Sequence, residues 1–289
     1  MALSTKRVFV YRRTVDWGSL CWDDMAKQCS FGTLWKSALP WVRFYEDVLG
    51  VSYFEWRMRL KELSLESVRA ANPNVVVDGW GAYFKRRREF GSHVAILLDD
   101  DDWVAPSVFN EMEKVKGYDF AVWLFYRCYL YHGVSITPKT KINPNGWVES
   151  CQAGYYMPDM ERRLGSDTLF QCCRSHSKVR MGWRHADISK PLAVDVCTWA
   201  SLSHGIMRPF WKIHCKDEPP SYTPLQDVND YAMSKNATLR ALRSFRREPQ
   251  VRWAASLIDT LIGMHEGMND YDAISIREAI RERMNGGSC

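Results

Sequence analysis

The fold is decided by the stretch Val94-Ala-Ile-Leu-Leu-Asp-Asp-Asp-Asp-Trp-Val-Ala-Pro106. Its apolar run, residues 94–98, has the length and character of a strand buried on both faces, as in a parallel sheet covered by helices. The run stops at four consecutive carboxylates, Asp99 to Asp102. The sequence therefore predicts a buried strand whose carboxyl end carries a dense negative charge.

Four adjacent carboxylates repel one another, so we expect a positive partner at this place. Carboxylate oxygens suit the hard cations Mg, Mn and Ca, and Mg and Mn sites commonly share their coordination with substrate phosphates. Ligands of open α/β sheets also bind beyond the carboxyl ends of the strands. The acidic run is thus a candidate metal and phosphate site.

Three other interpretations of the acidic run are open. Aspartates can complement the dipole at a helix N-terminus, where Ser107 could be the actual cap. A calcium loop needs regularly spaced ligands and a turn glycine, which this stretch lacks. A phosphatase of the Asp-x-Asp-x-Thr type would use the first aspartate as its nucleophile, but Trp103 stands where that motif has threonine.

Composition is that of a soluble globular protein, with 46% hydrophobic and 25% charged residues and a formal net charge of +5. The nine cysteines form no Cys-x-x-Cys pair, which favours a reducing compartment over a zinc site or a disulfide framework. The N-terminus lacks the apolar core of a signal peptide, and no run is long enough to span a bilayer. We expect a cytoplasmic protein with no transmembrane segment and no nucleic-acid partner.

The preceding segments alternate between strand and helix patterns. Val8 to Tyr11 and Val75 to Val77 are short apolar runs, and Phe54 to Ala71 has helical spacing. This alternation predicts a largely parallel sheet in an α/β domain. Arg12 and Asp78 follow the two strands, so we expect them to face the same site as the aspartates.

An apolar strand, Asp-x-Asp-Asp-Trp and an apolar-Pro stretch leading into a helix over 107–115 resemble the metal and nucleotide-sugar motif of GT-A glycosyltransferases. The four-aspartate version looks most like the rhamnosyltransferase group found in bacteria and some large viruses. The clear motif is confined to the stretch quoted above, with looser similarity from Arg7 to Trp211. The resemblance implies a GT-A-like, Rossmann-like mixed sheet flanked by helices.

The resemblance also implies a reaction. A sugar, rhamnose or another deoxyhexose, would pass from a nucleotide diphosphate sugar to a glycan or glycolipid acceptor, with Mn or Mg as the cofactor. Asp99 and Asp100 would hold the ribose and the metal shell, Asp101 would bind the metal, and His204 would complete the shell. Trp103, together with Asp102, would shape the donor pocket.

Other site residues follow from the same resemblance. Arg12, Asp78 and Arg86, or its neighbour Arg87, are candidate nucleotide contacts, although a run of charge is usually a solvated helix face. Asp167 is the candidate base that takes the proton from the acceptor hydroxyl, and it is equally well explained as a helix N-cap. His185 and His214 are alternatives to His204, and Arg208 is a further candidate phosphate contact.

Prolines at 219, 220 and 224 predict a linker, which divides the chain into a GT-A-like domain over 1–217 and a C-terminal helical extension over 218–289. Helical patterns cover 231–246, 251–264 and 273–284. Arginines between 240 and 247 could give peripheral membrane contact, but a solvated face explains them too. The tryptophan-rich segment 16–47 has no clear pattern, and Pro40 predicts a boundary within it.

Two functions of other classes compete with the transferase. A metal-dependent phosphatase or nucleotidyltransferase would also place carboxylates at a strand end and would release phosphate or pyrophosphate. A non-catalytic carbohydrate-binding protein would account for the 13 tryptophans and 13 tyrosines, and it would tolerate the loss of Asp101.

Overall fold

The computed structural model describes residues 5–12, 32–115, 117–130, 138–139, 150–169, 184–201 and 234–286. The chain forms two compact units. The sheet unit comprises Met1–Val15, Leu60–Arg127 and Ile136–Asp195, and the helical unit comprises Asp16–Arg59, Cys128–Ser135 and Val196–Cys289. The helical unit thus groups residues 16–59 with the C-terminal part of the chain.

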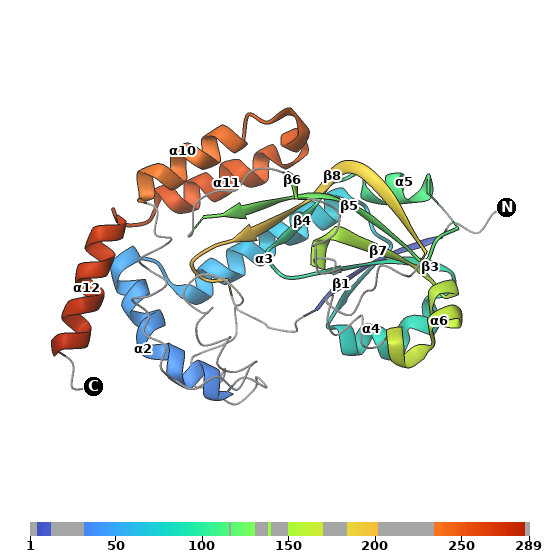
Figure 1. Ribbon diagram of the computed structural model, residues 1–289, viewed down its shortest axis with the longest axis horizontal. Coiled ribbons are helices and arrows are strands. Elements are labelled where there is room, and N and C mark those ends of the chain that lie inside the picture. Colours follow the sequence, from blue (N-terminus) through green and yellow to red (C-terminus); the bar gives the residue numbers. More distant parts are fainter. Residues whose placement is uncertain are drawn as a thin grey trace. The chain divides into compact units, whose positions relative to one another are not determined.

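The described strands form one mixed sheet in the order β2-β1-β3-β7-β5-β8-β4, with β6 paired to β5 (Figure 1). The strands are β1 (Lys6–Tyr11), β2 (Val75–Asp78), β3 (His93–Leu98), β4 (Asp102–Val104), β5 (Phe120–Tyr129), β6 (Pro138–Lys139), β7 (Ala153–Met157) and β8 (His185–Cys197). Helices flank this sheet, so the predicted α/β class is confirmed.

The parallel part of the sheet is β2-β1-β3. Tyr11 at the end of β1 lies opposite Asp78 of β2 and Leu98 of β3, so the three strands end at one edge. Every residue of β3 is buried. The unbroken apolar run predicted this burial, because a strand covered on both faces has no polar side to present. On its other side β3 pairs antiparallel with β7.

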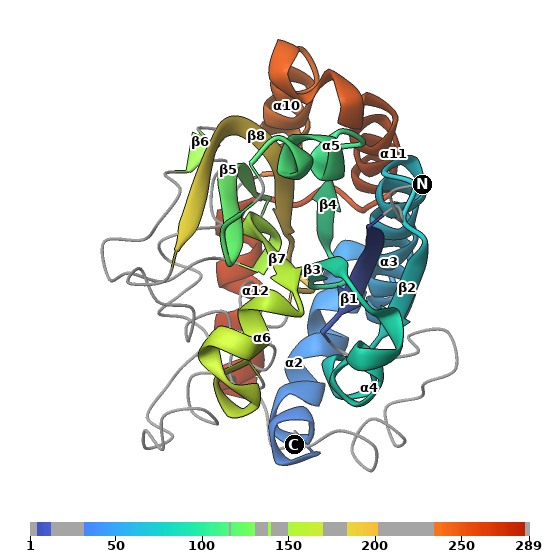
Figure 2. The same ribbon diagram turned by 90° about the vertical axis from the view of Figure 1, so that its right-hand side faces the viewer.

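Helices carry the chain between the two edges of this sheet. The described helices that lie wholly in the sheet unit are α4 (Trp80–Arg86), η1 (Arg87–Phe90), α5 (Val108–Glu113), η2 (Ser150–Gln152) and α6 (Asp159–Leu164). After β2, α4 and η1 return the chain to the amino end of β3. Since Met157 of β7 lies opposite His93 of β3, α6 also follows at that amino end. Figures 1 and 2 both show α4 and α6 near this end.

The helical unit contains α2 (Gly32–Leu49), the first part of α3 (Tyr53–Ala70), α10 (Lys235–Phe245), η5 (Pro249–Ala254), α11 (Ala255–Glu266) and α12 (Ala273–Gly286). The boundary predicted at Pro40 is wrong, since α2 continues through it. The Asn269 N–H donates to the Leu49 carbonyl at 2.9 Å, and the rings of Trp56 and His265 lie 5.0 Å apart. These contacts join early and late segments of the chain into one unit.

Two of the late arginines have carboxylate partners. Arg243 lies 2.7 Å from Glu266, and Arg246 lies 2.9 Å from Asp259. Such exposed pairs contribute little to stability, but they offset the positive charge that a membrane contact would use. In the described part of the chain, no helix has both the length and the apolar character needed to cross a bilayer.

Candidate functional site

Three of the predicted site residues meet at the carboxyl edge of the parallel strands. The Arg12 N–H donates to the Leu98 carbonyl at 2.9 Å, immediately before Asp99. Asp78 ends β2 opposite Tyr11, and its carboxylate lies 3.1 Å from the Lys61 ammonium. The order of strands and helices predicted that Arg12, Asp78 and Asp99 lie at the same ends of neighbouring strands, and the structure places them there. Lys61 is an additional cation at these strand ends.

The four aspartates form a closed turn. The Asp99 N–H donates to Asp102 Oδ2 at 2.7 Å, and the Asp102 N–H donates to the Asp99 carbonyl at 3.2 Å. Asp100, Asp101 and Asp102 are buried, whereas Asp99 is half-buried. The turn thus holds several carboxylates close together with little access to water, and their mutual repulsion is correspondingly strong.

Asp102 is the most deeply buried of the four, at 1% exposed. Burial raises the pKa of its carboxyl well above the usual range, and the neighbouring charges of Asp195, Asp99 and Asp101 raise it further. Asp195 lies directly opposite Asp102 on β8 and is itself held by Arg127 at 2.6 Å. Arg127 therefore supplies a positive charge to a neighbourhood that is otherwise acidic.

A chain of buried hydrogen bonds supports the turn from helix α3. The Ser64 hydroxyl donates to the Asp102 carbonyl at 2.5 Å, so it accepts from the Tyr11 hydroxyl, 2.9 Å away. Burial raises the pKa of Tyr11, which keeps the phenol protonated as this donor. One turn later, Ser67 Oγ accepts from the Val104 N–H at 3.2 Å. Two serines spaced along one helix face thus fix the backbone around Asp102.

We expect the Ser64→Ala variant to lower the free energy of unfolding by about 2 kcal/mol, since it strands a buried phenol and a buried carbonyl. Urea denaturation of Ser64→Ala, of Tyr11→Phe and of the double variant Tyr11→Phe/Ser64→Ala measures these losses. The double variant should lose less than the sum of the two single losses, because the three groups form one chain. Strictly additive losses would contradict the chain.

Two predicted site residues lie elsewhere. Arg86 ends α4 near the amino end of β3 and pairs with Glu89 at 3.1 Å. Asp167 is exposed and follows Ser166, whose hydroxyl bonds to Glu161 of α6 at that same end. The sequence could not reveal this separation, because it depends on the crossover through α4 and on the antiparallel course of β7. Neither residue is brought to the aspartates.

The remaining predicted site residues are Trp103 and His185, which the structure describes, and three residues that it does not. Trp103 is fully buried in β4, and among the described residues its indole N–H has no hydrogen-bond partner. His185 starts β8, at the opposite end of that strand from Asp195, and stacks on Phe120 at 5.4 Å. The predicted ligand His204 and the alternatives His214 and Arg208 lie outside the described residues.

Sequence reasoning missed the groups that surround the turn. Ser64, Ser67, Arg127 and Asp195 come from α3, β5 and β8, which are distant in the sequence. Only the serine pair left a local signal, since two small hydroxyl residues on one face of an otherwise large-residue helix are typical of close packing against a backbone. In the sequence, Asp195 and Arg127 are single charged residues within strand patterns. Only the pairing of β4 with β8 places them beside Asp102.

The aspartate turn supplies the hard oxygen donors that Mg and Mn prefer. Across the described ranges, however, no three acidic, histidine or cysteine side chains converge as a complete metal centre.

No protein-family model matches the chain, and no curated protein matches it significantly.

Proposed function

We propose that the protein is a metal-dependent glycosyltransferase of GT-A-like fold, which transfers a sugar from a nucleotide diphosphate sugar to a glycan or glycolipid acceptor. The observation that carries this proposal is the aspartate turn, three of whose four carboxylates are buried at the carboxyl end of β3. This position lies beside the parallel strands β2-β1-β3, where open α/β sheets bind their ligands.

The repulsion within the turn favours a cation. Asp100, Asp101 and Asp102 are adjacent and buried, so their negative charges repel one another at short range in a poorly hydrated place. A divalent ion held by Asp99 and Asp101 would offset this repulsion. When bound, it supplies Lewis-acid stabilisation of the charge on the leaving diphosphate.

The residues of the neighbouring strand ends would bind the nucleotide. Asp100 and Asp78 provide acceptors for ribose hydroxyls or base N–H groups, and the Arg12 guanidinium offers charge to the diphosphate. Lys61 lies at the same edge, between Asp78 and the ring of Tyr11, and is a second cation for the donor. Trp103 directly follows the turn and is fully buried in β4, so its side chain would anchor the backbone that carries the carboxylates.

The test is the melting temperature of the wild type and of Asp101→Asn against nucleoside diphosphates and nucleotide sugars, with and without Mn. A ligand at about 100 times its Kd adds about 2.7 kcal/mol of stability, so one nucleotide should raise the melting temperature only when Mn is present. Asp101→Asn keeps the side-chain shape but removes one charge. We expect it to fold as well as the wild type without metal and to lose the Mn-dependent shift.

Asp187→Asn is the matched control, because Asp187 is a half-exposed carboxylate of the same unit, on β8. It should keep the full shift. No shift with any nucleotide would contradict the proposal, as would an equal shift in Asp101→Asn. Product analysis separates the remaining classes, since a transferase releases an intact nucleoside diphosphate, whereas a phosphatase or nucleotidyltransferase releases phosphate or pyrophosphate.

A further inference from the structure

A cavity lies within the sheet unit, at the amino end of β3. Its volume is about 450 Å³, which falls in the range of small-molecule sites. It is lined by Arg87, Arg88, Gly91, His93, Met157, Pro158, Glu161, Arg162, Gly165 and Ser166. The aspartate turn follows the other end of β3, so this cavity is separate from the proposed donor site.

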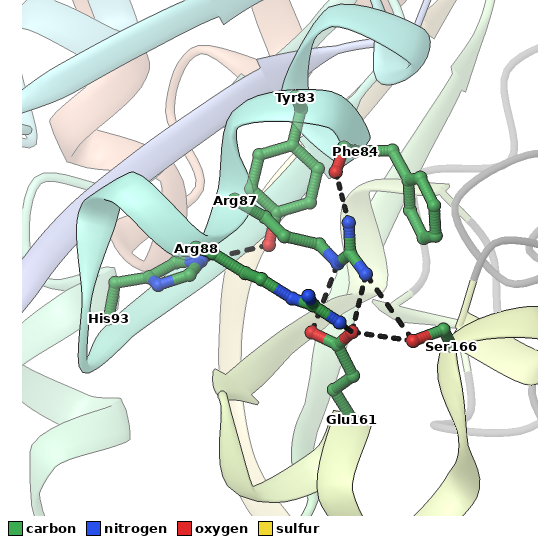
Figure 3. A network of polar contacts seen from close by, with 7 residues as sticks. All are labelled: Tyr83, Phe84, Arg87, Arg88, His93, Glu161 and Ser166. Carbon is green, nitrogen blue, oxygen red and sulfur yellow. Dashed lines mark hydrogen bonds and ion pairs between the residues drawn. The ribbon is translucent and has the colours of Figure 1, made fainter.

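A fixed ion pair forms one wall of the cavity. Arg87 is 9% exposed and Glu161 is 10% exposed, and the guanidinium binds both carboxylate oxygens. Arg87 also donates to the Phe84 carbonyl and stacks over the Phe84 ring at 3.8 Å. Ser166 Oγ donates to Glu161 Oε1 at 2.7 Å (Figure 3). This wall is preorganised and nearly neutral.

His93 contributes no charge to the cavity. Its Nδ1 lies 2.8 Å from the Gly91 carbonyl, which can only accept, so Nδ1 carries the proton. Its Nε2 therefore accepts from the Tyr83 hydroxyl, 2.9 Å away. Burial lowers the pKa of His93, in keeping with a neutral imidazole. Both ring nitrogens are used inside the protein, which leaves the arginines to recognise a ligand.

Two arginines give the cavity its charge. Arg88 is 78% exposed and reaches Glu161 Oε1 only at 3.5 Å, while Figure 3 shows it extending beside Arg87 toward that carboxylate. Arg162 is 75% exposed and pairs with Asp159, which is 71% exposed. An exposed pair of this kind is worth about 0–1 kcal/mol, so a stronger anion can replace Asp159 at little cost.

We propose that this cavity binds a phosphate monoester of a small ring-bearing molecule. The lining places three arginines against one glutamate, and Arg87 already neutralises that glutamate. Guanidinium groups bind phosphate oxygens through paired, charge-assisted hydrogen bonds, which Arg88 and Arg162 supply. The volume exceeds that needed for phosphate alone, and Met157 and Pro158 offer an apolar surface to a ring.

Isothermal titration of the full chain with glucose 6-phosphate, AMP and inorganic phosphate, at constant ionic strength, tests the proposal. At least one monoester should bind saturably and more tightly than inorganic phosphate. The Arg88→Gln/Arg162→Gln double variant should weaken that binding tenfold or more, through the loss of two charge-assisted contacts. Because both side chains are largely exposed, the variant should keep the wild-type melting temperature.

Arg243→Gln/Arg246→Gln is the matched control, since it removes two surface charges from the helical unit. It should bind the monoester as the wild type does, and so should Asp101→Asn. The proposal is overturned if neither monoester saturates at millimolar concentrations. It is equally overturned if the Arg88/Arg162 variant binds as tightly as the control, or if inorganic phosphate binds as well as both monoesters.

Discussion

The Glu161→Gln variant is expected to lower the free energy of unfolding by about 3 kcal/mol, because removing one member of a buried ion pair leaves the other charge uncompensated. The Arg87–Glu161 pair is almost fully buried and is held by two hydrogen bonds, with a third from Ser166. Glutamine keeps the shape of the side chain, so the loss reports the charge. Urea denaturation at neutral pH measures it.

Asp159→Asn is the control on the same helix, because Asp159 belongs to an exposed pair with Arg162. It should change the free energy of unfolding by no more than about 0.5 kcal/mol. The double variant Arg87→Met/Glu161→Leu leaves no unpaired charge. Its loss of unfolding free energy should therefore be smaller than the sum of the losses in the single variants Arg87→Met and Glu161→Leu. Equal losses in Glu161→Gln and Asp159→Asn would contradict a stabilising buried pair.

The pH dependence of this pair has a defined sign. The hydrogen bond from Arg87 lowers the pKa of Glu161 below its ordinary value. The pair therefore stabilises the protein above the unfolded-state pKa of glutamate, and this stability is lost as the pH falls through the lower folded-state value. The Glu161→Gln variant should lack this acidic component.

Acidification below neutral pH should cost the protein about 3 kcal/mol of stability through a different residue, His265. Burial lowers the pKa of His265 from 6.5 to about 4, and the hydrogen bond from Nδ1 to the Leu261 carbonyl only partly opposes this. Because the unfolded chain takes up the proton first, stability falls as the pH drops from about 6.5 to about 4. The cost corresponds to about 1.4 kcal/mol for each pKa unit.

Two measurements test the His265 prediction. Chemical denaturation at a series of pH values should show a steeper loss in the wild type than in His265→Leu, which does not titrate. An NMR titration of the folded protein should place the imidazole midpoint below pH 5. A midpoint near 6.5 would contradict the burial of His265 beside Trp56, as would identical pH profiles of the two proteins.

Local patterns predicted the elements that the sheet needs. The apolar runs at Val8, Val75 and Val94 became β1, β2 and β3, and the helical spacing from Phe54 became α3. The succession of these elements also predicted that Arg12, Asp78 and Asp99 share an edge, because parallel strands joined by helical crossovers end on the same side. These conclusions depend on neighbours along the chain.

Other assignments needed the tertiary structure. Arg86 and Asp167 have the residue types expected of a transferase site, yet the return of the chain through α4 and the direction of β7 place them at the opposite end of β3. Trp103 follows the acidic run directly, but its pairing in β4 directs it into the core. A sequence motif records spacing and chemistry, and it does not record which edge of a sheet a later segment reaches.

The sequence by itself determined the buried strand, the dense charge at its end and the α/β class, because burial periodicity and charge repulsion act locally. The tertiary structure alone decided what surrounds that charge. Ser64 reaches the turn from a helix, and Asp195 faces Asp102 because β4 pairs with β8. It also decided that Arg87, Glu161 and Ser166 form one wall of a cavity, since long-range pairing of segments sets these contacts.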